Sequence, residues 1–179
     1  MRGSVSIVGA SLAGYWAAET LRRDGFEGRI SLIGDEPHAP YDRPPLSKKF
    51  LAGDLEDDRL PLTTAEKLAD LGLEMRLGCR ATGLDVATRT LEVDGVAEPY
   101  DGLLIATGAR CRNLPGTAGL AGVHTLRTRD DAEAIRDALA NGARRVVVVG
   151  AGFIGAEVAS TAIGRGAEVT MVEALEAPF

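Results

Sequence analysis

Three glycines directly follow a run of four valines in the sequence RRVVVVGAGFIGAE, residues 144–157. A short β-branched run predicts a buried parallel strand, and glycines at this spacing let the backbone turn tightly and approach a pyrophosphate. We expect a helix to begin at about Phe153 and to point its free N–H groups at that anion. Glu173 lies 18 residues beyond Gly155, near the spacing of about 20 at which an acid binds a ribose diol. The pattern therefore predicts a dinucleotide site.

A second loop of this kind, GASLAG at residues 9–14, follows the compact hydrophobic run SVSIV. A helix is predicted over residues 12–23 and a strand over residues 29–33. That strand leads into Asp35 and Glu36, and Asp35 lies 21 residues beyond Gly14. Ser11 replaces the middle glycine, which costs some closeness of approach to phosphate. The alternative interpretation of this loop is a structural βαβ turn without a ligand.

Two such fingerprints in one chain suggest two dinucleotides, and an enzyme with two dinucleotides usually passes electrons between them. One would be a tightly held flavin and the other a diffusible nicotinamide, although spacing alone does not say which loop binds which. Glu173 is an acid where an NADPH enzyme would need a basic residue for the 2′-phosphate. NADH is therefore the favoured nicotinamide.

The segment GDEPHAPYDRPPLSK, residues 34–48, is rich in proline and is not expected to form a regular helix or a central strand. We expect its Pro-Pro pair to hold an extended backbone and Ser47 to cap a short helix. Arg43 and Lys48 would bring cations to the neighbourhood of the first glycine loop. The alternative is that both are solvated charges on a loop.

Composition excludes several classes of partner and site. The 179 residues are 45% hydrophobic and 26% charged, which is typical of one large or two small globular domains. A net charge of -6 argues against nucleic acid or anionic membranes as partners. Cys79 and Cys111 show neither metal-ligand nor CxxC spacing, so no metal site and no redox dithiol are expected. No apolar run suits a signal peptide or a membrane span, so a cytoplasmic location is the default expectation.

The remaining patterns complete an α/β architecture. The expected elements are a helix over residues 64–71, a strand over 73–77, an antiparallel meander over 82–100 that covers the parallel sheet, a strand over 103–106, and a helix over 129–140 capped by Thr128. The Gly- and Pro-rich stretch 115–122 is the expected domain boundary. The sequence thus predicts two Rossmann-like dinucleotide-binding βαβ units and a small antiparallel β-meander.

The chain resembles the FAD-dependent ferredoxin, rubredoxin and putidaredoxin reductases, including the reductase components of aromatic-ring dioxygenase and cytochrome P450 systems. The matching stretches are VSIVGASLAG, ISLIGDEPHAPYDRPPLSK, YDGLLIATGAR, HTLRTRDDA and RRVVVVGAGFIGAEVA. The DRPPLSK element is the most specific of these. Related flavoenzymes of the glutathione reductase type carry a CxxxxC dithiol in the region of the first helix instead, and this sequence has none.

The resemblance implies an FAD-binding domain over residues 1–112 and a truncated NAD-binding domain over residues 113–179. The residues that it implies for FAD are Gly9, Ser11, Leu12, Ala13 and Gly14 at the pyrophosphate, Asp35 with Glu36 at the adenosine ribose, the backbone of Ala81 at the adenine, Lys48 at the flavin edge near N5, and Arg43, Thr107, Gly108 and Arg127 elsewhere on the cofactor. The residues that it implies for NADH are Gly150, Gly152, Phe153, Ile154, Gly155, Glu157 and Glu173.

Lys48 and Glu157 are implied as the catalytic pair. If they meet beneath the flavin, they would form an ion pair that tunes N5, and Phe153 could stack on the ring until nicotinamide displaces it. The alternative for Phe153 and Ile154 is that they are helix-packing residues.

The expected activity is electron transfer from NADH through FAD to a ferredoxin-type iron–sulfur protein, in a mono- or dioxygenase system. Members of the family are about twice as long as this chain. We therefore expect a fragment, or a chain completed by a missing C-terminal segment or by a second chain. The alternative is a non-catalytic dinucleotide-binding module. An NADH oxidase or peroxidase would need a redox cysteine where the Pro-Pro pair lies, and none is present.

Overall fold

The computed structural model describes residues 3–178, which form two compact units. The first unit contains the described residues up to Asp42 together with Pro61–Ala109, and the second contains Arg43–Leu60 and the described residues from Arg110 onward. The proline-rich segment is thus divided, and its DRPPLSK end belongs to the second unit from Arg43 onward. The predicted assignment of residues 1–112 to FAD and 113–179 to NAD stays a prediction.

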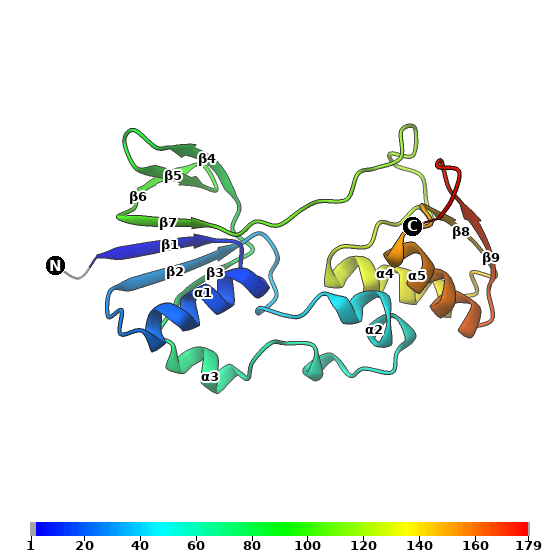
Figure 1. Ribbon diagram of the computed structural model, residues 1–179, viewed down its shortest axis with the longest axis horizontal. Coiled ribbons are helices and arrows are strands. Elements are labelled where there is room, and N and C mark those ends of the chain that lie inside the picture. Colours follow the sequence, from blue (N-terminus) through cyan, green and yellow to red (C-terminus); the bar gives the residue numbers. More distant parts are fainter. Residues whose placement is uncertain (1–2, 179) are drawn as a thin grey trace. The chain divides into compact units, whose positions relative to one another are not determined.

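A parallel sheet with the strand order β3-β2-β1-β7 forms the centre of the first unit. Its strands are β1 (Ser4–Val8), β2 (Arg29–Gly34), β3 (Glu74–Leu77) and β7 (Gly102–Ile105). Helix α1 (Leu12–Arg23) joins β1 to β2 and lies along one face of this sheet (Figure 1). On that face Ile7, Ala18 and Leu32 are fully buried together. Because side chains alternate along a strand, Val8 and Ile33 belong to the opposite face.

The meander covers that opposite face, as predicted. It consists of the antiparallel strands β4 (Ala81–Asp85), β5 (Thr90–Val93) and β6 (Val96–Pro99). Leu91 and Val93 of β5 pack against Val8 and Ile33 of the parallel sheet. The sheet is therefore covered on both sides, which explains why β1 and β2 carry buried apolar residues on both faces. Helix α3 (Ala65–Asp70) follows its cap, Thr64, whose side chain accepts a hydrogen bond from the N–H of Lys67.

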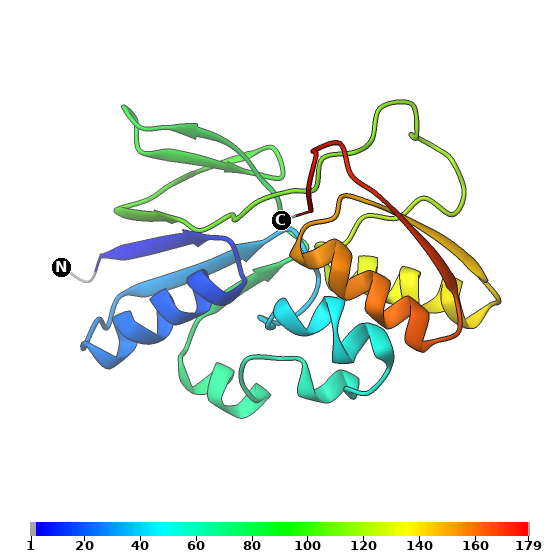
Figure 2. The same ribbon diagram turned by 45° about the vertical axis from the view of Figure 1, so that its right-hand side comes forward.

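The second unit contains the second βαβ unit. Strands β8 (Arg145–Val149) and β9 (Glu168–Val172) are parallel neighbours joined by α5 (Phe153–Gly164), and α4 (Arg129–Ala140) precedes them (Figure 2). A capping box between Thr128 and Asp131 begins α4, in agreement with the predicted cap. Leu139 of α4 and Ala162 of α5 are buried in one hydrophobic cluster with residues of both strands. On the other face of β8, Val147 is 64% exposed.

The segment of residues 43–60 packs on α4 through one aromatic anchor. It contains the 3₁₀ helices η1 (Pro44–Ser47) and η2 (Asp57–Arg59) and the short helix α2 (Lys49–Ala52). Phe50 is fully buried, and the guanidinium groups of Arg136 and Arg129 lie 5.0 and 6.0 Å from its ring centroid. Both arginines also form ion pairs with Asp57, at 3.7 and 3.1 Å respectively. Burial of the Phe50 ring, its cation–π contacts and the ion pairs of Asp57 thus attach this segment to α4.

Two expectations for this segment are wrong. Pro44 and Pro45 begin a 3₁₀ helix rather than an extended stretch. Proline tolerates this conformation because its fixed φ suits the first turn of a helix. Ser47 does not cap α2, because Lys48 occupies the N-cap position without a side-chain cap hydrogen bond. The Ser47 hydroxyl instead donates to a carboxylate of α5, and no local pattern signals that contact.

Within residues 3–178, every helix is too short or too polar to cross a lipid bilayer. The same residues contain no cluster of three or more His, Cys, Asp or Glu side chains that could hold a metal ion. Cys79 and Cys111 are both free thiols.

Replacing either of two glycines of α5 by alanine should change the free energy of unfolding in opposite directions. A Cβ at Gly155 would lie 2.0 Å from the carbonyl oxygen of Gly150, whereas a Cβ at Gly164 would have no neighbour within 4 Å. We expect Gly155→Ala to lower the free energy of unfolding by about 3 kcal/mol, because loop and helix must move apart. Gly164→Ala should raise it by up to about 1 kcal/mol, because alanine is the better helix former. Urea unfolding followed by circular dichroism measures both, and equal effects would contradict the backbone contact.

Candidate functional site

The first glycine loop is closed tightly by backbone contacts. Gly9 has a φ of +119°, and its N–H donates to the carbonyl of Ile33 at 2.7 Å. A Cβ at Gly14 would lie 1.9 Å from the carbonyl oxygen of Gly9, and a Cβ at Gly9 would lie 2.1 Å from that of Ala106. Only glycine fits at both positions. The loop is thereby fixed between its own helix and the end of β7.

This closure leaves the start of α1 accessible. Ser11 is the N-cap residue and makes no side-chain cap hydrogen bond. Leu12 and Ala13 follow in the first turn and are exposed. The N–H groups of a first helical turn have no partner inside the helix, and they carry the positive end of its dipole. These features are compatible with the predicted pyrophosphate contact of this loop, which stays a prediction.

The predicted FAD-binding residues of the first unit lie along one edge of the sheet. Val8 is paired with both Ile33 and Ile105, so the carboxyl ends of β1, β2 and β7 are level. Asp35 and Glu36 follow β2, and Thr107 and Gly108 follow β7, at the same edge as the glycine loop. The segment that leads into Ala81 also reaches this edge, because the N–H of Gly78 donates to the Glu36 carbonyl at 3.0 Å and that of Cys79 to the Gly34 carbonyl at 2.9 Å.

Tyr41 is a residue of this edge that sequence reasoning did not single out. It is 4% exposed, and its hydroxyl donates to Oε2 of Glu36 at 2.5 Å. This bond orients the Glu36 carboxylate, while Asp35 beside it is exposed. The sequence places a tyrosine five residues after an acid, but nothing in that spacing predicts the contact.

The second glycine loop repeats the geometry of the first. Gly150 has a φ of +105°, and its N–H donates to the carbonyl of Val172 at 2.8 Å. A Cβ at Gly155 would lie 2.0 Å from the Gly150 oxygen. Gly152 is the N-cap of α5, and a Cβ there would meet nothing within 4 Å. The space beside Gly152 is therefore open, at the position that Ser11 occupies in the first loop.

Glu173 faces the second loop from the end of β9. Its Oε2 accepts the N–H of Ala151 at 2.7 Å, and its Oε1 accepts those of Ala174 and Leu175 at 2.7 and 3.0 Å. These backbone donors, with Ala151 the largest cause, lower the pKa of Glu173 below its usual range. The side chain is therefore a fixed negative charge beside the glycine loop.

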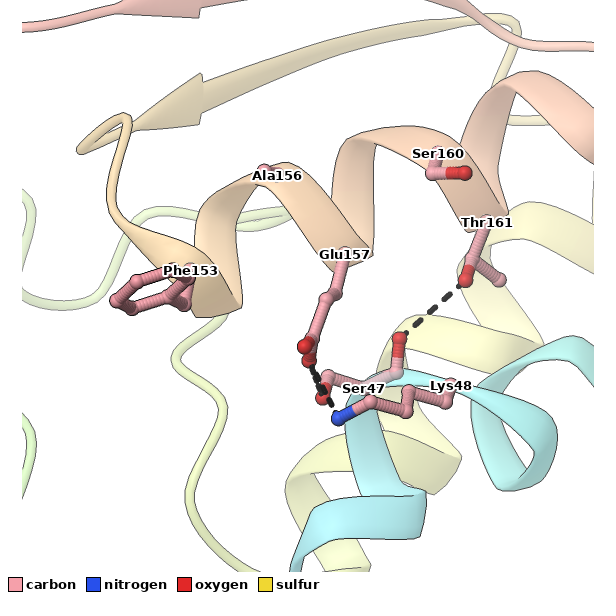
Figure 3. A pocket seen from close by; sticks show the side chains of 7 residues that line it. All are labelled: Ser47, Lys48, Phe153, Ala156, Glu157, Ser160 and Thr161. Carbon is pink, nitrogen blue, oxygen red and sulfur yellow. Dashed lines mark hydrogen bonds and ion pairs between the residues drawn. The ribbon is translucent and has the colours of Figure 1, made fainter. Parts of the chain in front are cut away.

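An open pocket of about 540 Å³ lies beside α5. It is lined by Ser47, Lys48, Phe153, Ala156, Glu157, Ser160 and Thr161 (Figure 3). Lys48 and Glu157 point toward one another there, and Lys48 Nζ lies 2.9 Å from Glu157 Oε2. The ion pair that the resemblance implies is thus formed. Phe153 is 77% exposed.

The Glu157 carboxylate is shared by two donors. Its Oε2 accepts from the Ser47 hydroxyl at 2.5 Å and from Lys48 Nζ at 2.9 Å, and Lys48 also donates to the Pro44 carbonyl at 3.2 Å. Ser47 first and Lys48 second lower the pKa of Glu157. An ammonium has three N–H donors, and contacts within the described residues use two of those on Lys48. One donor is left for a ligand.

Residues four positions apart on α5 attach the same segment. Beside Glu157, the Thr161 hydroxyl donates to the Ser47 carbonyl at 3.3 Å, and Arg165 Nη1 donates to the Ala52 carbonyl at 2.7 Å. We call Glu157, Thr161 and Arg165 the α5 polar stripe, since this spacing places them on one helix face. The spacing of four between these residues indicates a shared face of α5 and its C-cap, and Glu157 is the one of the three that is among the predicted site residues.

The two arginines predicted to bind FAD lie together in the second unit. Arg43 Nη1 donates to the carbonyl of Arg127 at 2.6 Å, and both side chains are half-buried. The candidate residues thus form two groups, one at the sheet edge of the first unit and one around α5 in the second. The cofactor contact of each residue stays a prediction.

The carboxylate of Glu157 should give the protein a pH-dependent contribution to stability. Because its folded-state pKa is depressed, that contribution is complete above the ordinary value of 4.5 and is lost as pH falls through the lower folded-state value. We expect Glu157→Gln to lower Tm by about 2 °C at neutral pH and much less in acid well below pH 4.5. Thermal unfolding across that range, with the exposed Glu176→Gln as the control, measures this. A loss of the same size at both extremes would contradict it.

The known proteins that the chain matches agree with this architecture. The family model for pyridine nucleotide-disulphide oxidoreductases matches residues 3–179. The chain is 44% identical to rhodocoxin reductase of Rhodococcus erythropolis, over 98% of the chain and 42% of that protein. It is 46% identical to the biphenyl dioxygenase system ferredoxin–NAD(+) reductase component of Paraburkholderia xenovorans (strain LB400), over 97% of the chain and 43% of that protein.

A solved structure shows the same fold. It is the covalent putidaredoxin reductase–putidaredoxin complex, which the chain matches with a TM-score of 0.88 and 41% identity, over 94% of this chain and 42% of that one. The predicted fold class, with two dinucleotide-binding units and a meander, is confirmed. The chain spans about two fifths of the length of these relatives. Because the family model matches nearly every residue, the chain belongs to the pyridine nucleotide-disulphide oxidoreductase family.

Proposed function

We propose that the chain is part of a flavoprotein oxidoreductase that passes electrons from NADH through FAD to a ferredoxin-type iron–sulfur protein, within a mono- or dioxygenase system. One observation carries the proposal: the Lys48–Glu157 ion pair lines a pocket beside α5, and α5 is the helix that follows a dinucleotide-type glycine loop. The names of two relatives, a rhodocoxin reductase and a ferredoxin–NAD(+) reductase component, support the acceptor class.

The residues present fit two dinucleotides. In both loops the sixth glycine leaves no room for a Cβ and the first has a positive φ that favours glycine, so the backbone can turn at the end of the strand and present the N–H groups of a helix. The first loop is assigned to FAD, with Asp35 and Glu36 at the adenosine ribose. Tyr41 supports this assignment, because it holds the Glu36 carboxylate in one orientation. The second loop, with its open space beside Gly152, is assigned to NADH.

FAD, when bound, supplies a ring that accepts a hydride equivalent from NADH and releases electrons one at a time. The chain's own residues would bind the two cofactors, orient them and tune the flavin edge electrostatically. Lys48 keeps one N–H for the flavin edge, and Glu157 holds the ammonium in place at 2.9 Å. Phe153 offers an exposed aromatic face in the same pocket. These roles need no protein acid or base.

Glu173 supports NADH as the electron donor. Its carboxylate is fixed by the Ala151 N–H and is ionised at neutral pH, since its pKa is lowered. A ribose diol can donate hydrogen bonds to it, whereas a 2′-phosphate would meet a like charge. NADH is a cytoplasmic metabolite, so we also propose a cytoplasmic location.

The second candidate function is a non-catalytic dinucleotide-binding module. One observation favours it, namely that both glycine loops, each with an acid after the neighbouring strand, lie within the described residues. Purified protein with flavin absorbance that bleaches on addition of NADH would support the reductase. Colourless protein that still binds NADH would support the module.

The two adjacent lysines provide a matched test of the catalytic pair. Lys48 is bound to Glu157, whereas Lys49 begins α2 with an exposed side chain. In the FAD-loaded protein we expect Lys48→Ala to slow NADH-dependent flavin reduction about tenfold or more, since a donor at the reacting edge is lost. Lys49→Ala should leave it unchanged. Stopped-flow absorbance measures both, and a wild-type rate in Lys48→Ala would remove Lys48 from the proposed mechanism.

Glu173 should set the nucleotide preference. We expect Glu173→Ser to reduce the ratio of kcat/KM for NADH to that for NADPH by about tenfold, because the diol acceptor and the repulsion are lost together. Glu168→Ser, at the exposed start of the same strand, is the control for charge. Steady-state kinetics with both nucleotides gives the ratio. An unchanged preference in Glu173→Ser would show that another residue selects NADH.

A further inference from the structure

Ser47 touches α5 with both its side chain and its backbone. The residue is 6% exposed, although it lines an open pocket. Its hydroxyl donates to Glu157 Oε2 at 2.5 Å, and its carbonyl accepts the Thr161 hydroxyl at 3.3 Å (Figure 3). Neither contact is needed to end η1 or to begin α2, since Lys48 is the N-cap of α2. The Pro44 carbonyl within η1 lies 3.5 Å from the same hydroxyl, so the much shorter bond to Glu157 is its main contact, and that contact is tertiary.

The Lys48–Glu157 ion pair alone would be poorly ordered. The Lys48 side chain is 50% exposed and that of Glu157 is 32% exposed. Ion pairs with this exposure are weak, because water competes for both partners and two long side chains must be held still. A hydroxyl from a short helix that begins with two prolines has much less freedom to lose. A bond from such a donor to an ionised carboxylate is also among the stronger hydrogen bonds.

We propose that Ser47 is a positioning residue, whose hydroxyl fixes the Glu157 carboxylate so that this carboxylate holds Lys48 Nζ at the pocket. The use of the pair toward a flavin rests on the proposed function. The positioning itself is a property of the chain and can be tested without cofactor.

The other charged residues on the elements packed against α5 do not explain the orientation of the Glu157 carboxylate. Within the described residues, Lys48 is the charged group in contact with Glu157. Arg165, after the end of α5, donates to the Ala52 carbonyl, and Lys49 of α2 is exposed. On the strands beneath α5, Arg145 and Glu168 are exposed at the ends remote from the glycine loop.

The test follows the Glu157 carboxyl by ¹³C NMR in the purified chain without added cofactor, with the signal assigned from Glu157→Gln. Loss of the Ser47 hydroxyl removes the largest cause of the lowered pKa, so Ser47→Ala should shift the titration of Glu157 upward. Ser47→Thr keeps a hydroxyl and should restore the wild-type curve. A wild-type curve in Ser47→Ala, or an equal shift in both variants, would overturn the proposal.

Ser31 provides the matched control. It is also 6% exposed, and its hydroxyl donates to Glu74 Oε2 at 2.7 Å in the first unit. Ser31→Ala loses the same kind of bond and should leave the Glu157 titration unchanged. If Ser31→Ala shifted that titration as much as Ser47→Ala does, the effect would be general destabilisation and the proposal would fail.

Thr161→Val gives a second measure, which serves even if Ser47→Ala does not fold. It removes the donor to the Ser47 carbonyl and keeps the hydroxyl of Ser47. We expect an upward shift smaller than that of Ser47→Ala, and no shift at all would count against the proposal. Because these titrations use the chain without cofactor, a failure of the proposed function would leave the positioning result standing.

Discussion

The structure depends on one backbone contact that occurs twice. In each glycine loop the carbonyl oxygen of the first glycine lies where the sixth residue would carry its Cβ, at 1.9 Å in the first unit and 2.0 Å in the second. This contact sets the start of the helix against the end of the strand. The exposed helix start and the acid after the neighbouring strand then face the same edge. The anion site proposed for each loop thus depends on a restriction on volume rather than on any charged residue in the loop.

The second unit adds the Lys48–Glu157 ion pair to this frame. Residues 43–60 are held on α4 by Phe50 and on α5 by the α5 polar stripe. Lys48 is thereby attached to the helix that the second glycine loop begins. The loop proposed for NADH and the cation proposed for the flavin edge therefore belong to the same unit and are connected through α5. Their mutual geometry is consequently set by helix packing and not by two independent loops.

Two acids at the candidate site of the second unit are kept ionised by hydrogen bonds. Glu173 is held by three backbone N–H groups, and Glu157 by a hydroxyl and an ammonium. Neither carboxylate is deeply buried, so the desolvation that would raise its pKa is small compared with these donors. Each is an oriented negative charge: Glu157 faces a lysine, and Glu173 is proposed to face a ribose. Orientation of this kind is what a protein contributes when a cofactor supplies the chemistry.

Local patterns in the sequence were sufficient for both βαβ units, the meander and the Thr128 cap, because strand alternation, helix periodicity and capping act over a few residues. The ion pair of Lys48 with Glu157 was expected only through a family resemblance. The predicted capping role of Ser47 is wrong, and the contacts of Tyr41 and Thr161 are not predicted by local patterns. The hydrogen bond from Ser47 to Glu157 joins residues 110 positions apart, so it exists only once two segments have packed. The sequence by itself determined the strands, helices and glycine turns, while the tertiary structure decided which side chains hold one another in the site, because those contacts depend on packing between distant segments.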